Sequence, residues 1–589
     1  MNPSCLLAVV SLVATLEVAS AHSVWIIGEK EHPWEKAGTL WALDTTTRPG
    51  WIQPEYADST VNLVRKIKER GGAIWSPQWW ARYLENVLAD GDLSTGWNMV
   101  PYAASHPVRG VSLIIDLGAT FPVNRITLST GEERKGAKVN ILKGYEVFLG
   151  GTGEEPKYDF LMRDTENENP DIDIRFRTQF VRHIKLKVAT DYGFVINEVG
   201  VYGSGYAPRA EYLSHPIDLE GPANFGTIKL AAQIDPKARI LLRTRTGLTP
   251  DPFIYYKKTG TGEEVPVSRE EYEALPKNLK GRIVDDLDNW SSWSFPYDVE
   301  ALLQGTPIIS PGNRRYLQFK IDFITEATTD KASVDFVSFE YSTPPVAHKI
   351  VAEVSPIEVV FGQVTEFKYF VRPTIRGNDT GFDALEIRTP YKAEVKEVKI
   401  DNSPVNFSSQ VKADRFIVFL DRKVETEQLI EINFSCLVTV YGTTFWGRAF
   451  DSQTDEFPQD ILPGDATPDV DTNSLSIIGT LERDLLKSVA VWPNPFTPNG
   501  DGINDSTTIS YTLLKAKKQV NVKVSIYDLQ GGLIRTLYSS KDKAGPNSVR
   551  WDGTDREGKL LPPGIYIYQI SVNTDTGKFI RTGTITLVY

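Results

Sequence analysis

Two short stretches of the sequence concentrate the oxygen-bearing side chains that a metal ion needs. Residues 90–95 read DGDLST, and residues 499–505 read NGDGIND. A hard cation such as Ca2+ takes several oxygen ligands, and a tight turn can bring carboxylates, hydroxyls and backbone carbonyls together around it. Both stretches are therefore candidate metal loops, and for each the alternative is an ordinary turn.

The second stretch fits a turn better than a metal site. Asn499, Asp501 and Asp505 only loosely imitate the start of a calcium loop, because the twelfth position counted from Asn499 is Ser510, where an EF-hand has glutamate. Asn, Asp and Gly are the residues that tight turns prefer. We therefore expect these side chains to hold a turn.

Catalytic motifs are not found in the sequence. The six histidines are scattered, and none forms a His-Glu-x-x-His motif; a Gly-x-Ser-x-Gly elbow, a P-loop and a dinucleotide fingerprint are also missing from strand-to-helix contexts. The acidic pair Asp285–Asp286 lies outside any long strand–helix alternation of the kind that carries many glycosidase sites. Cys436 lies in an apolar run, which predicts a core residue rather than a nucleophile. We therefore expect a protein that is not an enzyme.

The elements that position such loops are expected to be strands. The chain has 589 residues, which predicts about three to five domains, and its 44 glycines, 36 prolines and 11% aromatic residues favour short strands and tight turns. The fold class is therefore predicted to be all-β, as a tandem array of β-sandwiches. The net charge of −12 argues against nucleic acid and anionic membrane surfaces as partners.

The N-terminus has the pattern of a signal peptide, residues 1–21. Residues 5–16 are apolar, and Ala19-Ser20-Ala21 supplies a small-x-small cleavage site. A membrane anchor or a buried first strand are the alternatives, because the first residues carry no Lys or Arg. No later stretch is long and apolar enough for a transmembrane segment. The only two cysteines are Cys5 and Cys436, a usage that suits bacterial export without disulfides.

A set of ordered motifs follows within residues 55–205. They are DGDLSTGW at 90–97, IDLG at 115–118, GYEV at 144–147 and INEVGVYG at 196–203. In this order they resemble the discoidin or coagulation-factor C-type family. The resemblance implies a galactose-binding-like jelly-roll sandwich, with ligand-binding loops at one end.

The same resemblance implies a structural calcium site in the first acidic loop. It would use side-chain oxygens of Asp90, Thr95 and Glu198 together with backbone carbonyls. The full predicted ligand set is Val87, Asp90, Asp92, Thr95, Asn197 and Glu198. The alternative is an Asx turn with Glu198 in solvent.

The resemblance also implies a sugar site, where an aromatic ring meets the C–H face of a pyranose and basic side chains bind its hydroxyls. The candidate residues are Trp79, Trp80, Tyr102, His106, Arg109 and Arg134. Trp97 belongs to the motif itself and is expected in the core. For each aromatic residue, a structural role is the alternative.

The rest of the chain reads as three further sandwiches. Residues 217–342 form one, with a helix after the capping residue Ser268, and residues 346–480 resemble a generic immunoglobulin-like sandwich. Within the latter, the acidic residues 451–473 favour a solvated linker. Residues 487–589 resemble the immunoglobulin-like domain of the flagellar hook-capping protein, and their NGDGIND stretch is similar to C-terminal segments of type IX secretion substrates.

Together these patterns predict an exported protein, located outside the cell or at its surface. Its predicted function is non-catalytic adhesion through carbohydrate or cell-surface glycan, with other surface proteins as further candidate partners. Two alternatives stay open: a structural spacer without glycan binding, and a β-only polysaccharide-degrading enzyme.

Overall fold

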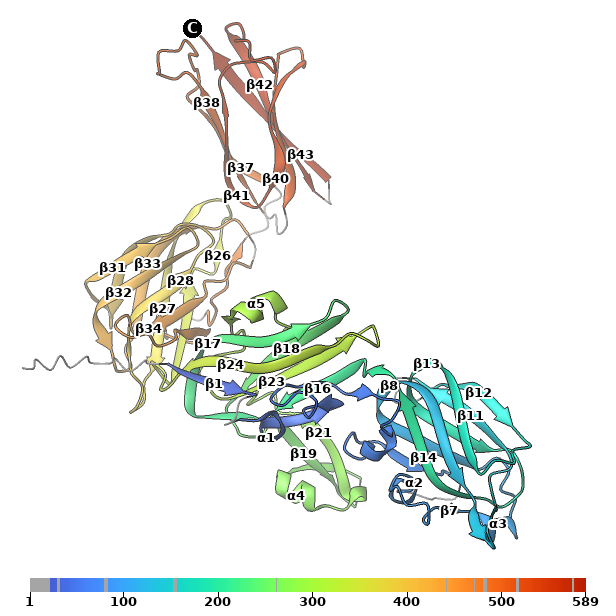
Figure 1. Ribbon diagram of the computed structural model, residues 1–589. Coiled ribbons are helices and arrows are strands. Elements are labelled where there is room, and N and C mark those ends of the chain that lie inside the picture. The colour runs from blue at the N-terminus through green and yellow to red at the C-terminus, as the bar shows by residue number, and fades with distance from the viewer. Residues whose placement is uncertain are drawn as a thin grey trace, which may run out of the picture. The chain divides into compact units, whose positions relative to one another are not determined.

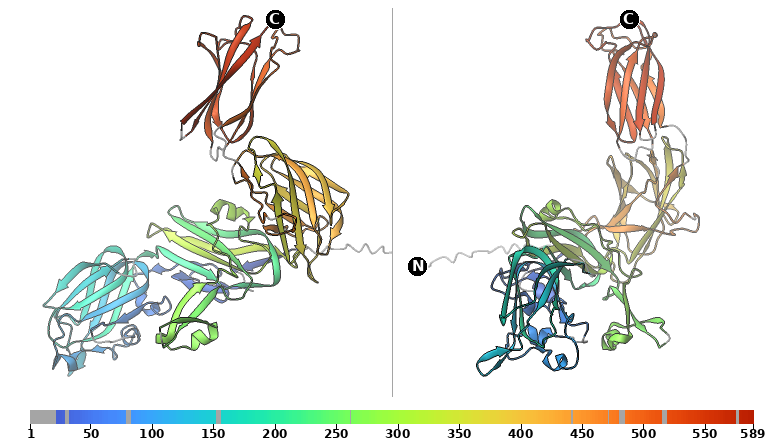
Figure 2. Two further views of the ribbon diagram at one scale, coloured as in Figure 1. Left: turned by 180° about the vertical axis from the view of Figure 1, so that it is seen from behind. Right: turned by 90° about the vertical axis from the view of Figure 1, so that its right-hand side faces the viewer.

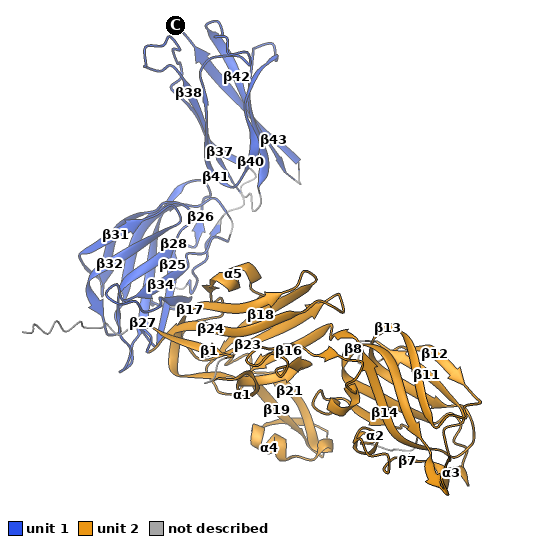
Figure 3. Cartoon of the chain, in the orientation of Figure 1, with its two compact units in different colours: residues 1–21, 344–589 blue, residues 22–343 orange. Residues whose placement is uncertain are grey.

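Strands form nearly all of the regular structure in the computed structural model (Figure 1). It describes residues 22–28, 32–78, 83–151, 156–260, 262–440, 442–470, 472–479, 485–514, 519–574 and 577–589. The predicted signal peptide, together with Trp79 and Trp80, lies outside the described residues. The all-β prediction and the tandem sandwiches are confirmed. The described chain divides into two compact units, residues 22–343 and 344–589 (Figure 3).

The jelly roll in the first unit is built around two long strands, β8 and β13, which pair antiparallel. Their register shifts between Arg175 and Gln179, and again after Val181. Such irregularities bend a sheet, so that β8 pairs with β6 near its start and with β14 further along. In sheet order the strands are β12 (Tyr158–Asp164), β11 (Tyr145–Gly150), β13 (Asp171–Val188), β8 (Ser112–Thr130), β14 (Val195–Gly203) and β7 (Trp97–Asn98), with β6 (Ala73–Trp75) beside β8.

The jelly roll is an insertion in a second sandwich. Strand β1 (Ser23–Ile27) pairs with β24 (Ala332–Ser342), and β2 (Gly38–Trp41) pairs with β16 (Arg209–Ser214). The chain therefore begins this sandwich before the jelly roll and completes it afterwards. The predicted domain at 217–342 omits these strands, because pairing across some 300 residues leaves no local pattern. The other strands of this sheet are β17 (Ile217–Ile234), β18 (Ala238–Gly247), β22 (Thr306–Pro307) and β23 (Arg314–Thr325).

A small sheet and a helix extend this sandwich. Helix α4 (Arg269–Ala274) starts after Ser268, whose side chain accepts a hydrogen bond from the Glu271 N–H at 3.2 Å, as its spacing predicted. The sheet consists of β19 (Phe253–Lys258), β20 (Glu264–Val267) and β21 (Lys280–Asp285). The short helical elements elsewhere in this unit are α1 (Trp34–Ala37), α2 (Glu85–Leu88), α3 (Val100–Ala103) and α5 (Val299–Gln304).

The third sandwich corrects the prediction for residues 451–473. Strand β35 (Gln459–Pro463) pairs parallel with β25 (Lys349–Ser355) and antiparallel with β34 (Gly447–Phe450), so part of this acidic segment belongs to the sheet. The fully buried Glu353 carboxylate then accepts backbone N–H groups from Ala466, Thr467, Thr472 and Asn473. A buried carboxylate on the neighbouring strand thus organises a segment whose composition suggested a linker.

The remaining strands of the third sandwich surround a core that includes Cys436. Its thiol is 1% exposed, and burial raises its pKa to about 11, so the cysteine is a core residue as predicted. The strands are β26 (Glu358–Val359), β27 (Val364–Thr374), β28 (Phe382–Arg388), β29 (Glu394–Ile400), β30 (Ser403–Pro404), β31 (Phe407–Val411), β32 (Arg415–Val424), β33 (Ile430–Leu437) and β36 (Ile478–Gly479).

The C-terminal sandwich consists of two sheets that lie face to face (Figures 1 and 2). Trp551, which is 1% exposed, packs between them against Phe496 and Tyr566. One sheet contains β37 (Leu486–Trp492), β38 (Thr507–Leu513) and β41 (Gly545–Trp551); the other contains β40 (Leu533–Asp542), β39 (Val520–Tyr527), β42 (Gly564–Thr574) and β43 (Gly577–Leu587). Within the residues that the structure describes, no helix is both long and apolar enough to span a membrane.

Candidate functional site

The first acidic loop follows α2 and brings four oxygen atoms together. The Thr95 Oγ1 atom lies 2.9 Å from Asp90 Oδ2, 2.9 Å from the Asp92 carbonyl oxygen and 3.4 Å from the Val87 carbonyl oxygen. A hydroxyl has one proton and can donate it to only one of these acceptors. The loop therefore holds a surplus of oxygens around one point, which is the donor set that a hard cation prefers.

Glu198 reaches the same loop from strand β14. Its Oε2 atom accepts the Gly91 N–H at 3.2 Å. Burial raises the pKa of this carboxyl, and the Asp90 charge adds to that effect, against the opposing Gly91 N–H and Arg65. A carboxylate from a distant strand thus lies beside a negatively charged loop, an arrangement that a bound cation would stabilise.

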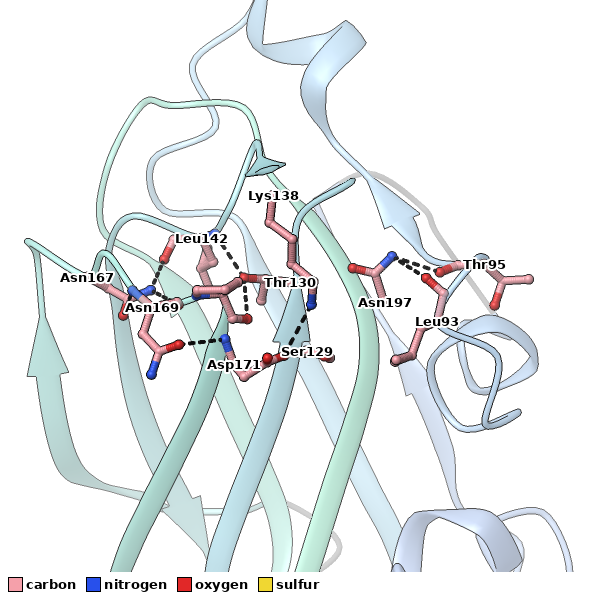
Figure 4. A network of polar contacts seen from close by, with 11 residues as sticks. Leu93, Thr95, Ser129, Thr130, Lys138, Leu142, Asn167, Asn169, Asp171 and Asn197 are labelled. Carbon is pink, nitrogen blue, oxygen red and sulfur yellow. Dashed lines mark hydrogen bonds and ion pairs between the residues drawn. The ribbon is translucent and has the colours of Figure 1, made fainter. Parts of the chain in front are cut away.

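Asn197 holds the loop against strand β14 (Figure 4). Its Nδ2 atom donates to the Leu93 carbonyl at 3.0 Å and to the Thr95 carbonyl at 3.1 Å. The Asp92 side chain instead accepts the Ser94 N–H at 2.8 Å. All six predicted metal-binding residues therefore belong to this loop and its support, with Asn197 placed to position the loop through its amide nitrogen.

Carboxylate, histidine and cysteine side chains alone do not make this site. Among the described residues, no group of three or more such side chains is arranged to hold a metal ion. Any cation here would depend on the Val87 and Asp92 carbonyls and the Thr95 hydroxyl as well. Calcium therefore stays a prediction, with a donor set that fits it.

The loop end of the jelly roll carries the predicted sugar-binding residues. Tyr102 lies in α3 with its side chain 48% exposed, and His106 is exposed in the following loop. Arg109 fixes this loop to the neighbouring 189–193 turn, because its Nε donates to the Ala189 carbonyl at 3.0 Å and its backbone N–H to Asp191 Oδ1 at 3.3 Å. The two segments therefore form one surface.

Glycine allows these two segments to approach so closely. A Cβ atom at Gly193 would lie 2.9 Å from the Val100 Cα and 3.1 Å from the Ala103 Cβ. The same turn presents Tyr192, which is 68% exposed. Sequence reasoning missed this tyrosine, although an aromatic residue beside Gly193 in an Asp-Tyr-Gly turn was a usable signal. Tyr192 adds an open aromatic ring to the loop end.

Arg134 comes from the hairpin β9 (Glu132–Arg134) and β10 (Ala137–Val139) at the same end. Its side chain is 66% exposed and pairs with Glu132 at 2.9 Å. The hairpin is tied to the start of β14, since the Val195 N–H donates to the Asn140 carbonyl at 2.9 Å. The position of Trp79 and Trp80 relative to these residues lies outside the described part of the chain.

A polar network braces this end of the sandwich (Figure 4). The Asn167 Nδ2 donates to the carbonyls of Leu142 and Asn169, both at 2.8 Å, and the Thr130 hydroxyl donates to the Pro170 carbonyl at 2.9 Å. Satisfied buried hydrogen bonds of this kind restrict local motion. The binding loops therefore rest on a braced scaffold. Trp97 also belongs to that scaffold, 7% exposed and packed edge-on against Phe194, as predicted.

The second acidic loop, residues 499–505, is a turn closed by its own carboxylates. Asp505 accepts the N–H groups of Gly500 at 2.7 Å and Gly502 at 2.8 Å, and Asp501 accepts the Ile503 N–H at 2.7 Å. These carboxylate oxygens accept hydrogen bonds from backbone N–H groups and do not face other oxygens. The turn prediction agrees with this geometry.

Comparison with known families identifies the C-terminal region. Residues 490–587 match the CHU_C type IX secretion signal domain. The protein is exported. Its predicted location, outside the cell or at its surface, is confirmed by this match, which also agrees with the similarity of its NGDGIND stretch to type IX substrates. The resemblance to the hook-capping protein stays a prediction.

Solved structures similar to part of the chain include carbohydrate-binding modules and, over 27% of its length, a Ruminococcus gnavus GH29 fucosidase that is 17% identical with a TM-score of 0.19. Chitosan-binding module 1 from a Paenibacillus sp. IK-5 chitosanase/glucanase is 20% identical over 19% of this chain and 80% of its own, with a TM-score of 0.16. The family 32 module of C. perfringens NanJ, in complex with galactose, is 22% identical over 20% and 82%, with a TM-score of 0.17. A Clostridium perfringens module in complex with GalNAc-β-1,3-galactose is 20% identical over 23% and 97%, with a TM-score of 0.18. No match was found among curated proteins.

Proposed function

We propose that this exported protein is a non-catalytic carbohydrate-binding protein that adheres to glycans through the loop end of its jelly roll. One observation carries the proposal: an exposed aromatic residue and basic side chains share one braced surface. Tyr102 of α3 is followed directly by the loop with His106 and Arg109, and Arg109 joins that loop to the turn that presents Tyr192. Open rings beside hydrogen-bond donors are the combination that a pyranose needs.

Each residue has a distinct role in this proposal. The Tyr102 and Tyr192 rings offer faces for the C–H groups of a sugar. The Arg109 Nε donates to the Ala189 carbonyl, which fixes the guanidinium plane. Its Nη atoms donate to no acceptor among the described residues. Those Nη atoms are therefore available to sugar hydroxyls. A fixed donor loses little conformational entropy on binding, which favours affinity.

We also propose that calcium binds the loop of residues 90–95. The oxygens of Val87, Asp90, Asp92, Thr95 and Glu198 would hold it, and Asn197 would position the loop. When bound, the cation neutralises the charges of Asp90 and Glu198. The loop leads directly into β7, and β7 leads into α3 with Tyr102. Holding the loop thereby also holds the segment that carries the sugar site.

The hydrogen-bond partners of Asp285 and Asp286, the acidic pair that could have served in hydrolysis, support a non-catalytic role. Asp285 Oδ1 accepts the buried Arg245 guanidinium at 2.8 Å, whereas Asp286 accepts the Asn289 side chain at 2.8 Å. Each carboxylate thus has its own structural partner, and a glycosidase would need two carboxyl groups facing one bond. The residues are better explained as supports of the second sandwich.

A glycan array on the full chain tests the proposal. We expect binding to at least one glycan, reduced strongly by Tyr102→Ala and Arg109→Ala. Release of reducing sugar from the glycans that bind, measured in parallel, would contradict the non-catalytic role. An array with no bound glycan would support the structural-spacer alternative instead.

A further inference from the structure

An aromatic surface lies on the jelly roll away from the loop end. It covers strands β12, β11 and β13, which are neighbours at the edge of the sheet (Figure 1). Val147 and Leu149 of β11 face the core, whereas Phe148 between them faces outward. Phe148 stands opposite Phe160 of β12, and their ring centroids are 5.6 Å apart. Phe160 is 61% exposed, although a phenylalanine in a strand normally finds a buried position.

The ring of Tyr158 extends this surface. Tyr158 of β12 is opposite Gly150 of β11, and a Cβ atom at Gly150 would lie 3.4 Å from the Tyr158 ring. The ring therefore lies at van der Waals distance from the side-chain position of Gly150. Burial raises the pKa of the Tyr158 hydroxyl, with Asp116 adding to the effect.

A lysine lies between the rings. Lys185 of β13 is opposite Phe148, and its Nζ atom is 5.8 Å from the Phe148 centroid and 5.7 Å from the Tyr158 centroid. The neighbouring Lys187 is neutralised by Glu146 at 3.1 Å. Among the described residues, no carboxylate forms an ion pair with Lys185. Its ammonium group thus lies outside the ion pairs of the described residues, in a chain whose net charge is −12.

We propose that Phe148, Tyr158, Phe160 and Lys185 form a second binding surface, the sheet platform, for an anionic polysaccharide. The rings offer faces for the C–H groups of successive sugars, and Lys185 offers its charge to a carboxylate or sulfate group. Three adjacent strands about 4.8 Å apart present an open, extended surface. That shape suits a stretch of polymer passing across the sheet, whereas the loop end suits a sugar held from one side.

The test measures binding of the full chain to soluble polysaccharides by affinity electrophoresis and calorimetry. The probes are polygalacturonate as a carboxylated polymer, dextran sulfate as a sulfated one and dextran as a neutral one. We expect binding to one or both charged polymers, weaker at high ionic strength because salt screens an exposed charge pair. Phe160→Ala and Lys185→Gln should each lower this affinity about tenfold, the size of one lost ring or charge contact.

Matched variants separate a specific site from general effects. Phe295→Ala removes another exposed phenylalanine, 87% exposed and outside the jelly roll, and Lys229→Gln removes an exposed lysine of β17. Both should bind as the wild type does. Wild-type affinity in Phe160→Ala and Lys185→Gln, equal losses in the matched variants, or no binding to either charged polymer would overturn the sheet platform. Tyr102→Ala affects only the loop end, so failure of one proposal is distinguishable from failure of the other.

Discussion

Two acidic loops of similar composition serve different purposes in this molecule. In residues 90–95, the Thr95 hydroxyl faces the oxygens of Val87, Asp90 and Asp92, and Glu198 arrives from another strand. In residues 499–505, the carboxylate of Asp505 receives two backbone N–H groups of the same loop. The carboxylates of both loops accept backbone N–H groups, and in the first loop Asp90 accepts the Asp92 N–H at 3.0 Å and Asp92 the Ser94 N–H at 2.8 Å. The first loop differs in that three further oxygens also surround the Thr95 hydroxyl.

This difference shows what composition alone leaves open. A loop in which the carboxylate oxygens meet only N–H donors is complete without a ligand. Where several oxygens surround one hydroxyl, their negative partial charges repel one another, and a bound cation offsets that repulsion. The deciding partner of the first loop, Glu198, is about 100 residues away in the sequence, so only the fold brings it there.

The fully buried Glu353 is a further carboxylate that accepts backbone N–H groups. Its replacement should have the largest effect on the free energy of unfolding. Glu353→Gln puts an amide group against backbone N–H groups of residues 466–473, which should cost about 3 kcal/mol of unfolding free energy. Thermal unfolding of the full chain measures this cost. Glu358→Gln, at an exposed position, is the control and should leave the transition unchanged.

The stability that Glu353 provides should also depend on pH. Burial pushes the pKa of Glu353 upward, but the N–H groups of Ala466, Asn473 and Thr467 outweigh burial, and the pKa lies below its usual value. The stabilisation is therefore fully present above the unfolded-state pKa and is lost as the pH falls through the folded-state value. An unchanged acid transition in Glu353→Gln would contradict this role.

Calcium should stabilise the first loop but leave the second unaffected. At a concentration 100-fold above the dissociation constant, a bound ion adds about 2.7 kcal/mol to the unfolding free energy of the jelly roll. Chelator should remove this gain in the wild type, and Asp90→Ala should abolish the response. If chelator leaves the wild-type transition unchanged and elemental analysis finds no metal, the calcium proposal is wrong.

Asp505→Ala should destabilise the C-terminal sandwich by about 1–2 kcal/mol, because two backbone N–H groups lose their acceptor. Its calcium response should equal that of the wild type. Calorimetry with and without chelator measures both quantities. A calcium response that disappears in Asp505→Ala would mean that the second loop is the metal site.

The smallest effect is expected for Glu198→Gln in the presence of chelator. Because burial and Asp90 raise the pKa of Glu198, its ionised form is disfavoured in the metal-free fold. Stability of the metal-free wild type should therefore rise slightly as the pH falls through the folded-state pKa, and the glutamine variant should lack this rise. A marked loss of metal-free stability in Glu198→Gln would show that its hydrogen bond to Gly91 matters more than its charge.

Local signals in the sequence predicted local features well. Ser268 caps its helix, Cys436 and Trp97 are in the core, and the turn at 499–505 is closed by its own side chains. Each of these depends on a few neighbouring residues. The fold class followed from the same short-range patterns, because strand alternation and turn residues repeat along the whole chain.

Features that depend on distant partners were missed. Strands β1 and β2 are short, and only pairing with β24 and β16 defines them. Residues 459–463 read as part of a linker because one of their strand partners, β25, and the Glu353 that anchors the adjoining segment lie more than 90 residues earlier. The sheet platform likewise requires Lys185 of β13 to lie beside Phe148 of β11. No local pattern carries such information.

The central claim, that the loop end of the jelly roll binds sugar, is tested most directly by calorimetric titration of Tyr102→Ala. The ligand is a glycan that the array identifies, and Tyr56→Ala, with the same 48% exposure, is the matched control. We predict about a tenfold loss of affinity in Tyr102→Ala only, with its thermal midpoint nearly unchanged because an exposed ring contributes little to the core. Unchanged affinity together with a clearly lowered midpoint would make Tyr102 a structural residue and contradict the proposed sugar site.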